Sequence, residues 1–329
     1  MTAEAGLAAP FPVVSAAALE TRAAASPQWL IEQLWSAQAV GIIGGAPKSC
    51  KTWMALEMAV AVASGSACLG SFTVPTSGRV LLYAAEDSAT ALRLRLESLA
   101  KHHDCDLATL DIRVITTEAL RLDSEADQKR LEMTLILHRP ILLLLDPLVR
   151  LHSIDENAAG EIAALLGYLR TLQRHANVAI ALVHHARKNV STSGGAGYSL
   201  RGSSDLYAWV DSFLYLRRQQ DQLILSAEHR SASGTGPILL ELVASQTPGP
   251  YLQVASASAE SPPEDPIFNR ILELLRTSQP RTAEALRNDL QVRNQRVVEA
   301  LRLLSQQGRV VRSSQGYSLL TGSTPSLLL

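Results

Sequence analysis

The chain has 329 residues, of which 47% are hydrophobic, so it can bury a large core and has room for about two domains. Its formal net charge of −1 excludes wholesale electrostatic capture of nucleic acid but not local basic surfaces. Three cysteines, at positions 50, 68 and 105, show neither metal-binding spacing nor an even disulfide framework, which is typical of a reducing compartment. The Met1 end lacks a basic signal region, and the apolar run 141–145 is too short to span a bilayer. We therefore expect a soluble, cytoplasmic protein.

In chain order, residues 1–28 are rich in alanine, serine and proline and predict an N-terminal arm. Residues 29–253 then alternate between apolar strand candidates and helix candidates. The predicted strands are 40–44, 79–84, 112–115, 141–145, 179–183, 212–216, 223–227 and 238–243. The predicted helices are 52–64, 89–103, 124–137 and 156–176.

The predicted strands in the middle of this region are continuous apolar runs, which indicates strands covered on both faces. Strand–helix–strand order then predicts an α/β fold with a doubly wound, mainly parallel sheet. The last three strand candidates follow each other without helices, which favours an antiparallel extension of that sheet.

The C-terminal quarter has a different composition. Residues 254–265 are small and polar with two prolines and predict a linker, and residues 321–329 form a tail. Between them, residues 266–320 predict three helices and a β-hairpin, the order of a winged helix-turn-helix domain. On the third helix we expect a core face made by Val297, Val298, Leu301 and Leu304.

One short motif suggests nucleotide binding. The phosphate-loop pattern G-x-x-x-x-G-K-[ST] fits residues 45–52 at every position but one, because a cysteine replaces the second glycine. Such a loop turns backbone N–H groups and a helix N-terminus toward phosphate, while its lysine and hydroxyl contact phosphate and Mg²⁺. The expected ATP and Mg²⁺ site comprises Gly45, Ala46, Pro47, Lys48, Ser49, Cys50, Lys51 and Thr52.

Acidic residues follow two of the predicted strands. Asp146 ends the run "ILLLLD" and is expected to ligate Mg²⁺ at the sheet's carboxyl edge. Glu86 follows "VLLYAA" and is the candidate base for the attacking water. Asp87 competes for that role, and either residue could instead cap the helix that starts near residue 89.

Histidine and arginine supply further candidates. His184 and His185 close another strand, so at most one should face the nucleotide crevice, and no neighbouring ligand completes a zinc site. Residues 189–206 form a long Gly/Ser stretch, which is typical of a functional loop. Arg230 follows a predicted strand and is either a solvated side chain or an arginine finger for a neighbouring subunit.

Taken together, "GGAPKSCKT", "YAAED", "LLLLDPL", "VHHARK", "RGSSDL" and "EHR" resemble, in order and spacing, the RecA-like ATPases of the plasmid replicative helicase RepA branch and its AAA-family relatives. The resemblance covers about residues 29–243. It implies a RecA-like P-loop NTPase core and a homo-oligomeric ring, usually of six subunits, with ATP at subunit boundaries and single-stranded DNA in the channel.

The resemblance also implies residue roles. Lys51 and Thr52 hold phosphates and Mg²⁺, Glu86 is the catalytic base, Asp146 is the Walker B carboxylate, His185 senses the γ-phosphate, and Arg230 is the finger in trans. It places Arg187, Lys188 and Arg201 in or beside a DNA-facing loop. Two departures from the family pattern are Cys50, and His229 where relatives often have lysine.

The predicted third helix of the C-terminal domain has polar residues suited to reading base edges. Arg293, Arg296 and Arg302 are its candidate duplex-DNA contacts, while a protein-docking role stays open. We expect an ATP-hydrolysing DNA helicase or translocase of replication or mobile-element processing. The alternatives are an ATP-switched DNA-binding or regulatory assembly protein and, with less support, a small-molecule kinase.

Overall fold

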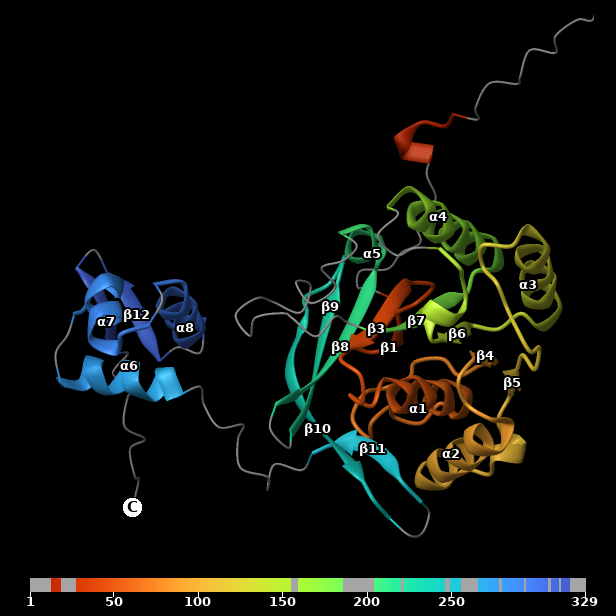
Figure 1. Cartoon of the computed structure of the whole chain (residues 1–329), viewed down its shortest axis with the longest axis horizontal. Coiled ribbons are helices and arrows are strands. Elements are labelled where there is room, and N and C mark those ends of the chain that lie inside the picture. The colour runs from red at the N-terminus through yellow and green to blue at the C-terminus, as the bar shows by residue number, and fades with distance from the viewer. Residues whose placement is uncertain are drawn as a thin grey trace, which may run out of the picture.

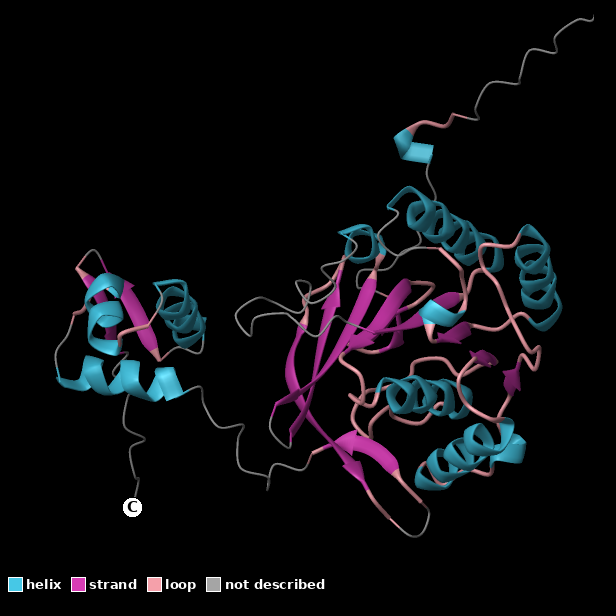
Figure 2. Ribbon diagram, in the orientation of Figure 1, coloured by secondary structure: helices cyan, strands magenta, loops and turns pink. Residues whose placement is uncertain are grey.

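The computed structural model describes residues 13–18, 28–154, 159–185, 204–219, 222–245, 249–255, 266–277, 280–292, 294–306, 309–313 and 315–319. Its main feature is a nine-stranded sheet in the order β11-β10-β9-β8-β3-β7-β6-β4-β5 (Figures 1 and 2). The strands are β3 (Val40–Gly45), β4 (Val80–Ala84), β5 (Ile112–Val114), β6 (Leu142–Asp146), β7 (Ala179–His185), β8 (Ser212–Gln219), β9 (Gln222–His229), β10 (Thr235–Val243) and β11 (Tyr251–Val254).

The sheet is mostly parallel, as predicted from the buried apolar runs. Strands β5, β4, β6, β7, β3 and β8 run parallel to one another. The antiparallel extension is also confirmed, because β9, β10 and β11 each pair antiparallel with the strand before them. The predicted α/β core is therefore present as a mixed sheet with its parallel part around β3.

Helices cover both faces of this sheet (Figure 2). On one face α1 (Lys51–Ser64) and α2 (Ala89–His102) pack against the sheet, in a cluster that includes Leu142 and Leu144. On the other face α3 (Glu125–His138) and α4 (Ala159–Ala176) pack against a cluster that includes Leu143 and Leu145. Adjacent β6 residues thus point to opposite covered faces, as expected for a strand buried on both sides.

Strands β1 (Trp29–Ile31), β2 (Trp35–Ser36) and β11 and helix α5 (Ser204–Trp209) were not predicted. The short hairpin of β1 and β2 precedes β3. Helix α5 begins within the Gly/Ser stretch that the sequence predicts as a loop. Strand β11 ends at Val254, so the predicted linker starts too early, because this residue pairs with Leu240 of β10.

A buried polar network joins α1 to α2. The side chain of Glu57 on α1 is fully buried, and its Oε1 accepts a hydrogen bond from the backbone N–H of Leu69 at 2.7 Å. The same oxygen lies 2.9 Å from Nε2 of His103, at the end of α2. Nδ1 of His103 in turn lies 2.7 Å from Oγ of Ser66. A buried carboxylate with such partners fixes the two helices against each other.

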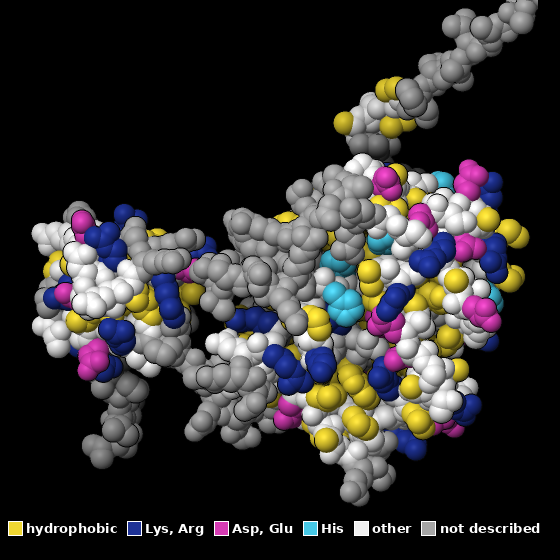
Figure 3. All heavy atoms as spheres, viewed as in Figure 1, with side chains coloured by type: hydrophobic (Ala, Val, Ile, Leu, Met, Phe, Trp, Pro, Cys, Tyr) yellow, Lys and Arg dark blue, Asp and Glu magenta, His cyan; other side chains and the backbone are white. Residues whose placement is uncertain are grey.

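Helix α3 presents apolar side chains to solvent. Leu131 and Leu135 are buried, whereas Met133, Ile136 and Leu137 are 69%, 62% and 75% exposed. The last three residues have helical spacing and form one stripe. Hydrophobic side chains are visible at the right edge of the molecule in Figure 3, where Figure 1 draws α3. Contiguous exposed apolar side chains mark interaction surfaces more often than isolated ones do.

The C-terminal residues form a unit with its own core. It contains α6 (Pro266–Thr277), α7 (Ala283–Leu290), α8 (Asn294–Gln306) and a hairpin of β12 (Val310–Ser313) and β13 (Gly316–Leu319). Val297, Leu301 and Leu304 of α8 are buried, as predicted. The prediction for Val298 is wrong, because the residue lies about 100° around the helix from Val297 and is 46% exposed.

The predicted element boundaries agree closely with the structure where it describes them. Helix α4 begins at Ala159, whereas the sequence predicts a start at 156, and residues 155–158 lie outside the described part. Of the predicted N-terminal arm, only 13–18 and 28 are described, with a short 3₁₀ turn at Ala16–Ala18. Among the described residues, no helix is both long and apolar enough to cross a membrane.

Candidate nucleotide-binding site

The phosphate-loop motif lies between β3 and α1, next to the middle of the sheet. The chain leaves β3 at Gly45 and enters α1 at Lys51. Gly45 has a φ of +157°, and a Cβ there would lie 2.2 Å from the carbonyl oxygen of Leu216 and 2.6 Å from Oγ of Ser49. Glycine is needed at this position because there is no space for a side chain. Strand β3 has β7 on one side and β8 on the other, the crevice position where α/β folds bind phosphate.

Cys50 has a left-handed backbone. Its φ of 62° and ψ of 25° are values that glycine adopts freely and other residues rarely adopt. Lys48, two residues earlier, also has a positive φ of 64°. Cys50 therefore sits at a position where the motif uses glycine for its backbone freedom.

Lys51 and Asp146 are buried together at the start of α1. Lys51 is 4% exposed, and its Nζ donates a hydrogen bond to the carbonyl oxygen of Ala46 at 2.7 Å. Burial lowers the pKa of Lys51, and the nearby carboxylates of Asp146 and Glu86 oppose this. The ammonium group is thus held close to the loop that it would serve in phosphate binding.

Asp146 ends β6 on the α1 face and is 7% exposed. Burial raises the pKa of its carboxyl group to about 6, and the nearby carboxylates of Asp87 and Glu86 also raise it. A hydrogen bond from Thr52 and the positive charge of Lys51 lower it. A desolvated carboxylate beside a hydroxyl is the donor set that Mg²⁺ takes in a phosphate-loop site.

The two acidic residues after β4 have different partners. Glu86 accepts a hydrogen bond from Nε of Arg150 at 2.8 Å, and both side chains are exposed. Asp87 instead forms an ion pair with Arg95 of α2. Neither caps α2, because Ser88 is the N-cap and its hydroxyl accepts from the N–H of Ala91 at 3.2 Å. The capping alternative considered for both residues is therefore wrong.

The adjacent histidines of β7 point to opposite faces, as the strand alternation predicts. His184 is buried on the face covered by α4, in line with Ile180 and Leu182. His185 is in line with Val183 and lies on the α1 face, next to Gly45 in the register of β3 and β7. Of the two, His185 is the one on the phosphate-loop side.

Arg230 is not brought to this site within the subunit. It follows β9, whose last residue, His229, pairs with Ser212 at the start of β8. Leu216, further along β8, pairs with Gly45 at the phosphate loop. Arg230 therefore lies at the other end of these strands from the phosphate loop. It pairs there with Asp211 at 3.5 Å and donates to the carbonyl of Ala208.

The departure from the family pattern at His229 has a structural explanation. Its Nε2 lies 3.0 Å from the carbonyl oxygen of Gln33, and its ring packs edge-on against Trp29. Burial lowers the pKa of this histidine, while the contact with Gln33 opposes that change. His229 therefore joins the β1–β2 hairpin to the sheet.

Arg218 was missed by the sequence reasoning. It lies near the end of β8, and its Nε donates to the carbonyl oxygen of Lys48 at 3.2 Å. Its Nη2 lies 3.6 Å from Sγ of Cys50. An available signal was the pair Arg217 and Arg218, directly after a strand predicted to end at residue 216. Nothing in the sequence placed that strand beside β3.

The residues present fit ATP and Mg²⁺. Ser49 supports this reading: it is 1% exposed, and its Oγ has no hydrogen-bond partner within the loop that would hold phosphate. Lys51 would contact phosphate, and Thr52 and Asp146 would hold the metal ion. Among the described residues, no group of three or more histidine, cysteine or acidic side chains forms a separate metal site.

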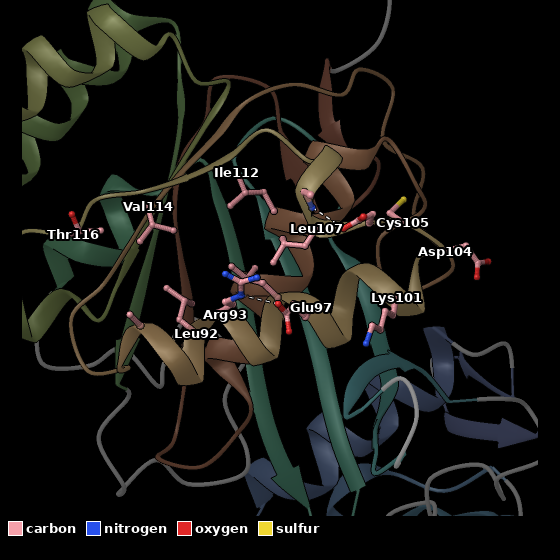
Figure 4. A pocket seen from close by; sticks show the side chains of 14 residues that line it. Leu92, Arg93, Glu97, Lys101, Asp104, Cys105, Leu107, Ile112, Val114 and Thr116 are labelled. Carbon is pink, nitrogen blue, oxygen red and sulfur yellow. Dashed lines mark hydrogen bonds and ion pairs between the residues drawn. The ribbon is translucent and has the colours of Figure 1, made fainter.

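A pocket of about 970 Å³ lies elsewhere, at the β5 edge of the sheet (Figure 4). Its walls include Leu92 and Leu96 of α2, Leu107, and Ile112 and Val114 of β5. Strands β4, β6 and β7 separate β5 from β3. This pocket is therefore distinct from the phosphate loop.

The candidate DNA contacts are only partly described. Arg187, Lys188 and Arg201, with the predicted channel loop, and also Arg293, lie outside the described residues. Arg296 and Arg302 are exposed on α8.

The chain is similar to a solved structure and to a family of known proteins. A solved structure of a DnaB-like replicative helicase, described together with its interactions with primase, is similar at 14% identity and a TM-score of 0.47. The similarity covers 63% of this chain and 55% of that one, so it spans little more than half of the helicase chain. A family model described as an AAA domain matches residues 7–191, more than half of the sequence. The chain, with its phosphate loop between β3 and α1, belongs to the AAA domain family.

Proposed function

We propose that this protein is an ATP-hydrolysing, ring-forming DNA helicase or translocase of the RepA type, acting in the cytoplasm in replication or mobile-element DNA processing. The observation that carries the proposal is the burial of Lys51 and Asp146 together at the N-terminus of α1. An ammonium group, a carboxylate and the Thr52 hydroxyl converge on one loop there, as Mg²⁺-dependent phosphoryl transfer requires.

Each residue has a stated part in the proposed reaction. The loop N–H groups and Lys51 bind the phosphates, and bound Mg²⁺ would neutralise charge that develops on them. Glu86 is the proposed base for water, with Arg150 holding its carboxylate at 2.8 Å in this state. His185 is the proposed γ-phosphate sensor, because it is the β7 histidine on the α1 face.

The position of Arg230 supports the proposed ring. Arg230 lies at the other end of the strands from the phosphate loop and cannot reach the loop of its own subunit. An arginine-finger role therefore requires a neighbouring subunit whose nucleotide it contacts. Head-to-tail contacts of this kind form a ring when the rotation between neighbouring subunits closes, and the proposal is that it does so here. The exposed stripe Met133, Ile136 and Leu137 provides apolar surface that a subunit contact could bury. The proposed ring is a hexamer with single-stranded DNA in its channel.

The C-terminal unit is proposed to be a winged helix domain. Its three helices and hairpin have the required order, and Arg296 and Arg302 are exposed on α8. An α8 placed in a major groove would bring these exposed arginines to DNA, and Arg293, which precedes α8 in the sequence, is a further proposed contact. The second candidate function, an ATP-switched DNA-binding or regulatory assembly protein, is favoured by the separate core of this unit.

The test combines ATPase activity with a sizing measurement, each with and without single-stranded DNA and Mg²⁺–ATP. We expect DNA-stimulated turnover and an ATP-dependent increase in mass, both lost in Lys51→Ala. Normal turnover in Lys51→Ala would refute the nucleotide site. ATP-dependent assembly with no DNA stimulation and no strand separation would favour the regulatory protein instead.

A further inference from the structure

Arg218 extends over the phosphate loop from the neighbouring strand. Leu214 and Leu216 of β8 belong to the cluster on the α1 face, so strand alternation places Arg218 on that same face. Gly45 pairs with Leu216, and Arg218 is therefore two residues beyond the level at which β3 ends. This brings its guanidinium group to the loop that leads into α1.

Its two contacts fall on the two residues of the loop that have an unfavourable backbone. Nε donates to the carbonyl oxygen of Lys48, and Nη2 approaches Sγ of Cys50. Lys48 and Cys50 are also the non-glycine residues with positive φ between β3 and α1. One exposed side chain thus touches both left-handed residues.

These contacts have a physical consequence. A non-glycine residue leaves the left-handed region unless its surroundings hold it there. The loop binds phosphate only while its N–H groups point inward, so any relaxation at Cys50 disperses the donors. The planar fork of arginine can hold a carbonyl and a neighbouring thiol at once, which a single ammonium group cannot do with fixed geometry.

We propose that Arg218 is a positioning residue that holds the phosphate loop in its binding conformation and offsets the replacement of glycine by Cys50. The inference rests on the proposed nucleotide site and adds a residue to it. The role is indirect, through Lys48 and Cys50. The need for Arg218 should therefore depend on which residue occupies position 50.

The experiment is a double-mutant cycle on the full chain with Arg218→Ala, Cys50→Gly and the double variant. We expect Arg218→Ala to raise the dissociation constants for Mg²⁺–ATP and ADP about fivefold, the scale of one lost hydrogen bond. In the Cys50→Gly background the same change should have less than a twofold effect. Arg217→Ala is the matched control, because it removes the same charge from the adjacent position on the opposite face, and it should leave binding unchanged.

A second measurement needs no nucleotide. Amide hydrogen exchange across residues 45–52 of the nucleotide-free protein should speed up in Arg218→Ala and change little when glycine occupies position 50. An equal loss of nucleotide affinity in both backgrounds would overturn the proposal in favour of direct nucleotide contact. Unchanged exchange in Arg218→Ala would overturn it as well. Failure of the wild-type chain to bind nucleotide, with exchange responding as expected, would refute the proposed function and leave the positioning role intact.

Discussion

Replacing Cys50 with glycine should stabilise the protein. The left-handed φ of 62° costs a cysteine about 1–2 kcal/mol relative to glycine. Glycine also gives the unfolded chain more conformational freedom, and this offsets about 0.4–1 kcal/mol of the stability gained by removing the cysteine's backbone cost. The weak contact between Sγ and Arg218, at 3.6 Å, is lost as well. The expected net gain in the free energy of unfolding is about 0.5–1 kcal/mol.

Thermal and denaturant unfolding of the nucleotide-free protein would measure this gain. For a core of this size, it corresponds to a rise of about 1–4 °C in the transition midpoint. Cys50→Ala is the matched control, because alanine loses the thiol but gains no backbone freedom, so it should be neutral or slightly destabilising. ATPase turnover in Cys50→Gly should be unchanged or higher. A fall in stability of more than about 1 kcal/mol in Cys50→Gly, with Cys50→Ala unaffected, would refute this reasoning.

The remaining predictions concern the acidic residues and the distant arginine. Glu86→Gln should bind ATP and assemble but hydrolyse ATP at least about 10²-fold more slowly, the scale of a lost general base. If Asp87→Asn shows this loss of hydrolysis and Glu86→Gln does not, Asp87 is the general base. Arg230→Ala should lose turnover but cost under about 1 kcal/mol of stability, because its pair with Asp211 is partly exposed. Mixing it with Lys51→Ala should restore some activity, and no recovery despite verified subunit exchange would exclude a finger in trans. The folded pKa of Asp146 is about 6, above its unfolded value of 3.8, so the free energy of unfolding should fall by up to about 3 kcal/mol between pH 4 and 7. Asp146→Asn should not show this fall, which denaturation at several pH values measures. If the variant's free energy of unfolding depends on pH as the wild-type value does, the raised pKa of Asp146 is contradicted.

The strands of the core could be predicted because burial on both faces leaves a strong pattern. Residues 142–145 are four consecutive leucines, and their neighbours in the sheet are comparably apolar. The β1–β2 hairpin could not be predicted in this way, because strands of two or three residues are too short to show a period. Val254 was assigned to a linker from composition, because the small and polar residues that follow it hide the end of a four-residue strand that pairs with the preceding strand β10.

The site could be predicted in part for a similar reason. The loop, Asp146 and Glu86 follow predicted strands, so chain order placed them near one edge of the sheet. The contact of Arg218 with the loop requires β8 to be the neighbour of β3, and strand order across a sheet leaves no local signal. The backbone of Cys50 was equally inaccessible, since φ at that position depends on how the turn closes. The location of Arg230 depends on the register in which His229 pairs with Ser212 of β8, and that register also leaves no local signal.

The buried network around Glu57 limits how the protein can respond to nucleotide. Its carboxyl group links the middle of α1 to the end of α2 through His103. If these helices slid past each other, this contact would break and leave a buried polar side chain without its partner. The two helices must therefore travel as a single rigid body when the γ-phosphate arrives or leaves. The segments after β4 and β6, which carry Glu86 and Arg150, lie outside that helix pair. Work done on a substrate would then be transmitted through these strand-end segments while the helix pair serves as the fixed frame.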